Sequence, residues 1–368
     1  MSKREICKGD TMGPSVITTA GTSQDMASQA VASQAVVAPI SVVEPMLIVE
    51  QKETTLLQTQ PKIVRPGEGT LWSAFGDSIR ALLSAEDTGG EIFVGHMEPP
   101  AGYGPPLHVH LKEDEIFIVE QGSFEFTIRD QVVQVGSGTV VYGPRNIPHT
   151  WRSVGEGLNR ATVISVPANF GVFFGRCAEA FAKGEPDMAE VMRIADEHGL
   201  LFVSPEQAAV YPEPTDPNVP QPKIVKQDEG LRIGSKGERG RGILMSGETN
   251  GQFLLVEVEV EPGYGPPPHV HTREDEVFLI QSGQIEFWID GTVTQAGPGT
   301  VVFAPRNVPH TFRGVGEGTA RAIVVVTPGA LEQFFMRREE LQQAGQLDEQ
   351  KLLNLAAEYG LHIVSPRQ

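Results

Sequence analysis

Short runs of alternating apolar and polar residues recur along most of this 368-residue chain. Residues 124–128 and 285–289 alternate in this way, so that every second side chain would lie on one face of a strand. The pair Asp290 and Gly291, which follows the second run, fits a type I′ hairpin turn. Glycines and prolines bound the runs, and this pattern is typical of an antiparallel sandwich or barrel.

A helical period replaces the alternation near residues 191–195 and again near residues 352–356. Gly199 and Gly360 follow these segments and fit the position that ends a helix. Because amphipathic stripes normally belong to a core, we expect each helical tail to pack on its barrel or on a neighbouring molecule, and not to take part in chemistry.

The whole pattern occurs twice along the chain. Residues 61–205 return as residues 222–366 at a constant offset of 161 positions, without a gap. Between residues 102–122 and 263–283, 13 of 21 positions are identical. We therefore predict two domains, 61–205 and 222–366, each of roughly 145 residues, a length that can enclose its own core.

Two segments lie outside the repeat. Residues 1–60 are rich in small and polar residues and are predicted to be a largely disordered leader, in which residues 40–57 hold enough Val, Leu and Ile for a strand or strap. Residues 206–221 contain four prolines and are predicted to form an extended, semi-rigid linker.

The charge and the cysteines limit the partners and the cellular environment that we expect for this protein. A formal charge of -18 argues against nucleic acid or an anionic membrane surface as a partner, since both need clustered Lys and Arg. The two cysteines, Cys7 and Cys177, form no paired motif, which favours a reducing interior. Asp10 and Gly13 interrupt any apolar run near the N-terminus, so we expect no signal peptide and a cytoplasmic location. A homo-oligomer is left open.

The repeat also separates the histidines that occur in both copies from those that occur in only one. His96, His198 and His362 have no histidine at the matching position of the other copy, and we expect them to be ordinary surface or helix-end residues. Three histidines and one glutamate are retained in each copy. They are His108, His110, Glu115 and His149 in the first copy, and His269, His271, Glu276 and His310 in the second.

The spacing of the retained residues suits a metal site. His108 and His110 are two positions apart, so on a strand both imidazoles would project from one face. Glu115 has the wrong parity for an unbroken strand, so the chain must bend through residues 111–114 to bring it back to that face. His149 would arrive from a separate strand after a proline-flanked turn, in which Asn146 can adopt a left-handed conformation.

Three neutral imidazoles and a carboxylate suit one divalent ion of manganese, iron, cobalt, nickel, copper or zinc in each domain. A six-coordinate ion would keep two positions open for a substrate or dioxygen, and the paired ligand sets predict equal occupancy. Two alternatives stay open: satisfied core histidines, and structural zinc, although structural zinc sites are usually cysteine-rich and closed.

The arrangement resembles the two motifs of the cupin superfamily. The first copy reads Gly102-x5-His108-x-His110-x4-Glu115-x6-Gly122 and then Gly138-x5-Pro144-x4-His149, and the second copy repeats both over residues 263–283 and 299–310. The resemblance implies a mainly β bicupin with two tandem double-stranded β-helix (jelly-roll) barrels, each holding a metal ion on three histidines and one glutamate. Asn146 and Asn307 depart from the family pattern, which usually has Gly there, but neither is a ligand.

By this resemblance the leading hypothesis is a quercetinase-like dioxygenase that opens a flavonol or related enolic ring. Glu115 or Glu276 would ligate the metal and could also accept the substrate's hydroxyl proton. Nine aromatic residues either line an aromatic ligand or are simply barrel core. They are Phe117, Phe124, Phe126, Tyr142, Trp151, Phe278, Phe287, Phe303 and Phe312.

Three other functions remain open at this point. An oxalate decarboxylase or oxidase would need a cation for a small dianion, and residues 102–107, just before His108, contain no Arg. Arg145 and Arg306 could reach the mouth of the site, but salt bridges to surface carboxylates explain them equally well. Isomerase chemistry and a non-catalytic small-molecule-binding or storage role are also compatible with paired cupin domains.

Overall fold

The computed structural model describes residues 59–212, 219–235 and 237–365. These residues belong to one compact unit, 56–368. The predictions for residues 1–58, and for the proline-rich part of the linker at residues 213–218, lie outside the described residues. None of the described helices is long and apolar enough to cross a membrane.

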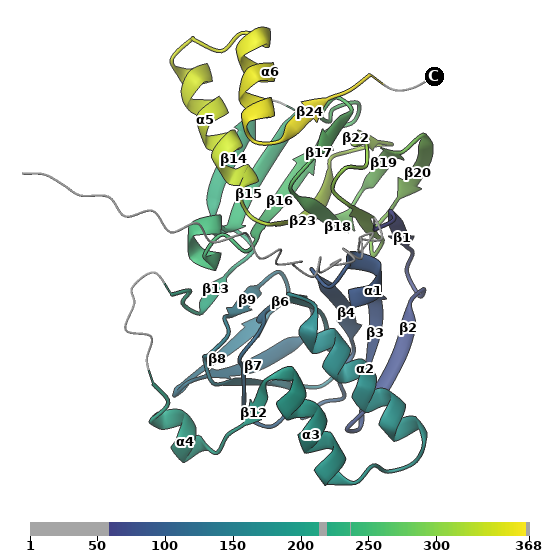
Figure 1. Cartoon of the computed structure of the whole chain (residues 1–368), viewed down its shortest axis with the longest axis vertical. Helices are drawn as coiled ribbons and strands as arrows, with labels where there is room; N and C mark the ends of the chain where they lie inside the picture. The colour runs from purple at the N-terminus through teal and green to yellow at the C-terminus, as the bar shows by residue number, and fades with distance from the viewer. Residues whose placement is uncertain (1–58, 213–218, 236, 366–368) are drawn as a thin grey trace, which may run out of the picture. The chain divides into compact units, whose positions relative to one another are not determined.

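Strands β1 to β12 and helices α1 to α4 make up the first copy (Figure 1). The strands are β1 (Lys62–Val64), β2 (Thr70–Ala74), β3 (Asp77–Leu83), β4 (Phe93–Met97), β5 (His108–His110), β6 (Asp114–Gln121), β7 (Ser123–Ile128), β8 (Gln131–Gly136), β9 (Val140–Gly143), β10 (His149–Val154), β11 (Arg160–Val166) and β12 (Leu200–Phe202). The helices are α1 (Ala85–Thr88), α2 (Asn169–Ala182), α3 (Met188–His198) and α4 (Pro205–Ala209).

The second copy repeats this order. Its strands are β13 (Lys223–Val225), β14 (Leu231–Ser235), β15 (Glu238–Leu244), β16 (Leu254–Val260), β17 (His269–His271), β18 (Asp275–Ser282), β19 (Gln284–Ile289), β20 (Thr292–Ala296), β21 (Val301–Ala304), β22 (His310–Val315), β23 (Ala320–Thr327) and β24 (Leu361–Ile363). Its helical segments are the 3-10 turn η1 (Ser246–Thr249), α5 (Leu331–Gln343) and α6 (Glu349–Glu358).

Each copy folds as a large sheet facing a small one. In the first copy the strand orders are β13-β9-β6-β11-β4-β3-β2 and β12-β5-β10-β7-β8. In the second they are β1-β21-β18-β23-β16-β15-β14 and β20-β19-β22-β17-β24. The mainly β, two-barrel fold expected from the motifs is confirmed. Asp290 and Gly291 both have positive φ, as the hairpin assignment requires.

The two copies exchange their first strands. Strand β1 pairs antiparallel with β21, where Lys62 lies opposite Phe303, and β13 pairs with β9, where Lys223 lies opposite Tyr142. Each large sheet therefore contains one strand from the other copy. The domain bounds 61–205 and 222–366 remain predictions, because they follow the repeat in the sequence and not the strand pairing.

The central strands of each large sheet are buried on both faces. In β6, Phe117 and Val119 belong to the core of the first barrel, whereas Ile116 and Ile118 belong to an apolar core shared by the two large sheets. This explains why the central strands read as continuous apolar runs instead of alternating. Tyr142 also belongs to the shared core.

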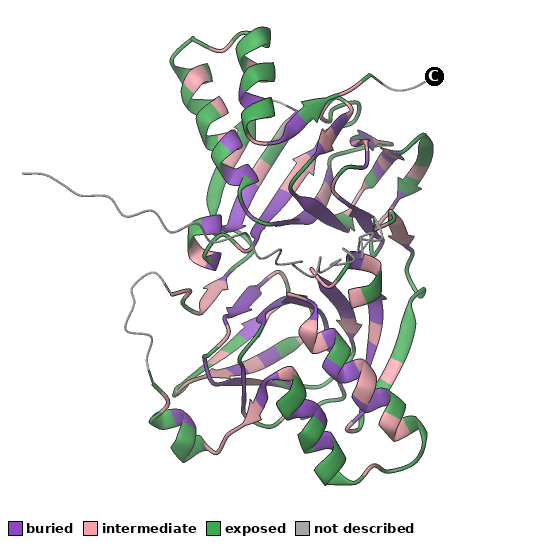
Figure 2. Cartoon of the chain, viewed as in Figure 1, coloured by how far each residue is buried: buried purple, intermediate pink, exposed green. Residues whose placement is uncertain are grey.

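The helical tails form as expected. In the first copy α2 packs on β2 and β4 (Figure 1), and Gly199 ends α3 in a left-handed conformation. In the second copy α5 and α6 bury only a few residues each and are otherwise largely exposed (Figure 2). The expectation of an extended linker is wrong at its start, because Ser204 caps the short helix α4 with its hydroxyl group.

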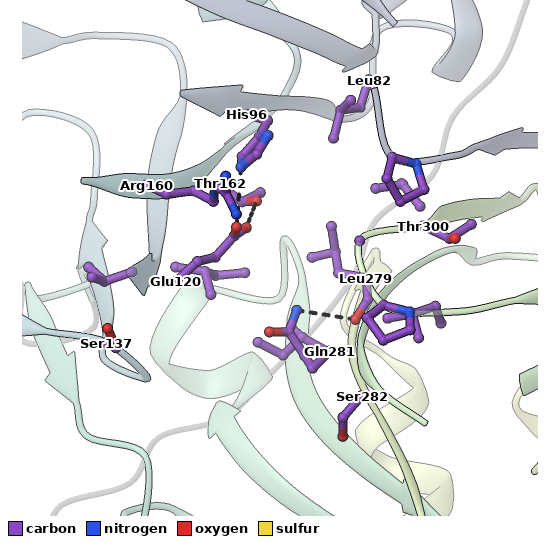
Figure 3. Close-up of a pocket in the computed structure, with 18 of the residues that line it drawn as sticks. Leu82, His96, Glu120, Ser137, Arg160, Thr162, Leu279, Gln281, Ser282 and Thr300 are labelled. Atoms are coloured by element: carbon purple, nitrogen blue, oxygen red, sulfur yellow. Dashed lines mark hydrogen bonds and ion pairs between the residues drawn. The ribbon is translucent and has the colours of Figure 1, made fainter. Parts of the chain in front are cut away.

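A cavity of about 960 Å³ lies between the two large sheets (Figure 3). His96, expected to be a surface or helix-end residue, is half-buried on β4 and lines this cavity, where its ring lies 3.2 Å from the Glu120 carboxylate. In the large sheet of the second copy, Glu257 stands at the position that matches His96. Its carboxylate accepts hydrogen bonds from Arg241 at 3.1 Å and from Arg321 at 2.8 Å. None of the eight retained His and Glu residues lines the cavity.

This buried carboxylate should make the fold sensitive to acid. Burial would raise the pKa of Glu257, but hydrogen bonds from Arg321 and Arg241 lower it below 4.5. Its stabilising contribution is therefore complete above about pH 4.5 and is lost as the pH falls through the lowered value. Denaturant unfolding between pH 7 and pH 3 should show a smaller loss of stability for Glu257→Gln than for the unaltered chain. An unchanged slope would exclude Glu257 as a source of the acid sensitivity.

Candidate metal centres

The first candidate centre is built by three strands. His108 and His110 are the ends of β5, Glu115 is the second residue of β6, and His149 opens β10. The chain leaves strand geometry at residues 111–113, as the parity of Glu115 requires. His149 lies directly opposite His108 in the antiparallel pair of β10 and β5. The structure thus brings the four predicted side chains together.

The second centre repeats this construction. His269 and His271 lie on β17, Glu276 on β18 and His310 on β22, with His310 opposite His269. In each centre all four side chains are buried, and one ligand atom from each lies within 4.8 Å of the others. The four groups of each centre can therefore bind one ion without rearrangement, because their ligand atoms already converge.

The turn before the third histidine is also repeated. Asn146 has φ 64° and its backbone N–H donates to the carbonyl oxygen of His110 at 2.7 Å; Asn307 has φ 66° and donates in the same way to His271. Asn tolerates this left-handed conformation better than most residues that carry a Cβ atom. The turn ties the strand of the third histidine to the strand of the second.

Substitutions at Asn146 should separate the backbone requirement from side-chain chemistry. Asn146 is exposed. Asn146→Gly should stay within about 0.5 kcal/mol of the original stability, whereas Asn146→Val should lose about 1–2 kcal/mol because a β-branched residue is strained at positive φ. Denaturant unfolding of both variants would measure this. Equal stability of the two would mean that the turn relaxes into another conformation.

Hydrogen bonds orient the histidines toward the centre of each site. The Nδ1 atoms of His108 and His149 lie 2.7 and 2.9 Å from the carbonyl oxygens of Pro106 and Ile147. A carbonyl accepts only from N–H, so Nδ1 carries the proton and Nε2 presents its lone pair. The Nε2 atom of His110 is buried without a hydrogen-bond partner. The donor set therefore fits a divalent transition-metal ion.

The charges of His108, Glu115 and Glu276 agree with this fit. Burial, reinforced by the neighbouring imidazoles, lowers the pKa of His108 to about 3, so this ring is neutral at physiological pH, as a metal ligand must be. Burial would raise the pKa of Glu276, but His271 and His310 lower it to about 2. Glu115 is shifted in the same direction by His110 and His149 despite its burial, so both carboxylates are ionised. Burial would lower the pKa of His110, but Glu115 and Glu113 raise it to about 10, so this ring must lose a proton when it binds an ion.

The aromatic residues fall into two groups. Phe117, Phe124, Phe126 and Trp151 contact one another in the core of the first barrel. Phe278, Phe287 and Phe312 do so in the second. Tyr142 and Phe303 instead belong to the core between the large sheets, so of the two alternatives they are core residues and do not wall the metal pockets.

Two neighbours of the first centre were missed by sequence reasoning. Phe170, in the first turn of α2, places its ring 5.8 Å from that of His110 at an interplanar angle of 81°. Glu113 accepts a hydrogen bond from Nδ1 of His110 at 2.6 Å. Glu113 lies within residues 102–122, which the second copy matches at residues 263–283. Sequence periodicity alone does not distinguish a carboxylate that bonds to a histidine from one that faces solvent.

Arg145 and Arg306 do not reach the metal centres. Arg145 donates to the buried carboxylate of Asp114 at 2.9 Å, and Arg306 donates to Asp275 at 2.8 Å. In the part of the chain that the structure describes, no Arg or Lys forms a hydrogen bond or ion pair with any of the eight retained His and Glu residues. The salt-bridge interpretation of both arginines is confirmed, but the carboxylates are buried and not on the surface as expected.

The comparisons with known proteins agree with the geometry. The Cupin domain family matches residues 95–166 and 256–326, one match over each centre. The chain is a bicupin. The quercetin 2,3-dioxygenase of Bacillus subtilis is 25% identical to this bicupin over 291 residues, which cover 76% of the chain and 86% of the relative.

Shorter and more distant likenesses also exist. The transcriptional regulator PuuR of Escherichia coli is 22% identical over 146 residues, or 40% of this bicupin and 75% of the regulator. Oxalate decarboxylase from Bacillus subtilis, solved at pH 4.6, superposes with a TM-score of 0.50 at 19% identity, covering 82% of this chain and 87% of that one. Another oxalate decarboxylase structure gives a TM-score of 0.50 at 18% identity, covering 82% and 89%. At these identities the solved structures show the fold alone.

Proposed function

We propose that this bicupin is a metal-dependent dioxygenase that opens an aromatic or enolic small molecule such as a flavonol. The observation that carries the proposal is the pair of complete centres of three histidines and one glutamate, each in a barrel whose core contains several aromatic side chains. The likeness to a quercetin 2,3-dioxygenase along 76% of the chain supports it. Dioxygen would be the second substrate.

The residues of each centre have distinct parts in this proposal. A divalent ion held by the four side chains would supply open coordination positions and positive charge for a substrate oxygen. The carbonyl groups of Pro106 and Ile147 fix the rings of His108 and His149. The ionised carboxylate of Glu115, or of Glu276 in the second centre, accepts the proton of the substrate's hydroxyl group. Phe170 and the barrel aromatics supply flat apolar surface and exclude water.

Oxalate chemistry is the enzymatic alternative, and the site supports it less well. A small dianion buried in a barrel needs a cation to offset its loss of hydration. Within the described residues no Arg or Lys bonds to either centre, and Arg145 and Arg306 are engaged by Asp114 and Asp275. The solved oxalate decarboxylases contribute the fold alone to this comparison.

The test is consumption of dioxygen by the purified chain. Protein loaded separately with Mn²⁺, Fe²⁺, Co²⁺, Ni²⁺, Cu²⁺ and Zn²⁺ would be mixed with a panel of flavonols, or with oxalate, and oxygen uptake and carbon dioxide release would be followed. We expect turnover of a flavonol with a redox-active ion. Turnover of oxalate alone would replace this proposal with the decarboxylase or oxidase, and no turnover with bound flavonol would indicate a binding protein.

The setting of the activity follows from the composition. We propose a cytoplasmic protein without a nucleic-acid or membrane partner, because a charge of -18 opposes both phosphate backbones and anionic lipids. Its partners would be the small-molecule substrate, dioxygen and one divalent ion per domain. Analytical sedimentation would measure whether the chain forms a homo-oligomer.

A further inference from the structure

The two centres differ in how one of the three histidines is held. Two of the three histidines are held alike in both: Nδ1 of His108 and of His269 faces a proline carbonyl oxygen at 2.7 and 2.8 Å. Nδ1 of His149 and of His310 faces a carbonyl oxygen at 2.9 Å in each case. The remaining histidine, His110 or His271, depends on a carboxylate that follows it by three positions.

In the first centre this carboxylate is held from both sides. Glu113 accepts from Nδ1 of His110 at 2.6 Å, and its second oxygen accepts from the side-chain amide of Asn169 at 2.7 Å. The amide oxygen of Asn169 in turn faces Nδ1 of His198 at 2.9 Å, at the end of α3. Arg176 extends the chain of contacts, with its guanidinium 3.1 Å from the other ring nitrogen of His198. The helical tail thus fixes the orientation of a candidate ligand.

In the second centre no hydrogen bond holds the matching carboxylate, Glu274. Glu274 lies 3.5 Å from Nδ1 of His271, an ion-pair distance at which the two groups form no hydrogen bond. Both of its oxygens are buried without a hydrogen-bond partner, and its side chain is 1% exposed. The reason is visible in the repeat: Ala330 stands where the first copy has Asn169, and Tyr359 stands where it has His198.

We propose that Glu113 and Asn169 are positioning residues that make the first centre bind its metal ion more tightly than the second. A carboxylate bonded to the outer nitrogen of a ligating histidine fixes the ring's orientation and strengthens the other nitrogen as a donor. Loss of such a partner typically costs about 10- to 100-fold in metal affinity. This inference rests on the metal binding of the proposed function but not on its reaction.

The test compares single-centre proteins. His269→Ala with His271→Ala leaves the first centre, and His108→Ala with His110→Ala leaves the second. Each full-length protein would be stripped of metal and titrated with Mn²⁺, with the free ion followed by electron paramagnetic resonance. We expect the first centre to bind about 10- to 100-fold more tightly. In the first-centre protein, Asn169→Ala should weaken binding by about 10-fold, and in the second-centre protein, Ala330→Asn should strengthen it.

Thermal unfolding of each metal-free protein serves as the folding control. Weaker metal binding by a variant that melts at its parent's temperature supports a positioning role. A purely structural role would lower both the metal affinity and the melting temperature. If a single-centre protein fails to fold, titration of the unaltered chain decides: two classes of site support the proposal, and one class overturns it. Equal affinity of the two single-centre proteins, or an unchanged affinity in Asn169→Ala, also overturns it. All of these readouts are independent of dioxygenase turnover, so failure of the reaction hypothesis would leave them interpretable.

Discussion

Replacing His108 and His110 together with alanine should lower the metal content from two ions per chain to one. Both imidazoles are buried and converge with Glu115 and His149 on one point, so two donors are lost at once. The loss of affinity should exceed the roughly 10- to 100-fold that removal of an outer hydrogen-bond partner costs. Untagged protein would be saturated with a single kind of divalent ion and then desalted. Elemental mass spectrometry then measures the number of ions per chain.

The matched control is His362→Ala. His362 is exposed on β24 and its counterpart in the first copy is Leu201, so this variant should keep two ions. If the double variant also keeps two ions, the histidine cluster is not the metal site. If it loses both, metal binding at the two centres is coupled, contrary to the expected loss of one ion. The equivalent pair in the second copy, His269→Ala with His271→Ala, should again leave one ion.

The candidate centres could be predicted from the sequence because they depend on local geometry. Residues two apart on a strand share a face, so His108 and His110 had to project together, and the parity of Glu115 required the bend seen at residues 111–113. The repeat then separated the retained histidines from the others. The left-handed turn at Asn146 was also predictable, because few residues with a Cβ atom adopt that conformation at low cost.

Three features could not be predicted, each for a physical reason. The exchanged strands β1 and β13 are three residues long, too short to carry a pattern that selects a partner. The side on which Tyr142 lies is undetermined by sequence, because all of β9 is buried and no polar residue marks a face. The bond between Glu113 and Asn169 joins residues 56 positions apart, and no local periodicity reports such a contact.

The core between the large sheets should carry a large part of the stability of the chain. Phe303 on β21 is 0% exposed within it, and the same strand pairs with the exchanged strand β1 at Lys62. Phe303→Ala removes an aromatic side chain from a position packed on all sides, and such a cavity costs about 3–5 kcal/mol. Because residues of both copies build this core, the loss should appear in one cooperative unfolding transition of the described unit.

Denaturant unfolding, followed by tryptophan fluorescence and by circular dichroism, would measure this loss. Val293→Ala on β20 is the control, since Val293 is 58% exposed and a surface change of this kind stays within about 0.5 kcal/mol. A cost below about 1 kcal/mol for Phe303→Ala would mean that the site collapses around the smaller residue. Two separated transitions would mean that each barrel keeps its own stability, and the strand exchange would then join the barrels without making them one cooperative unit.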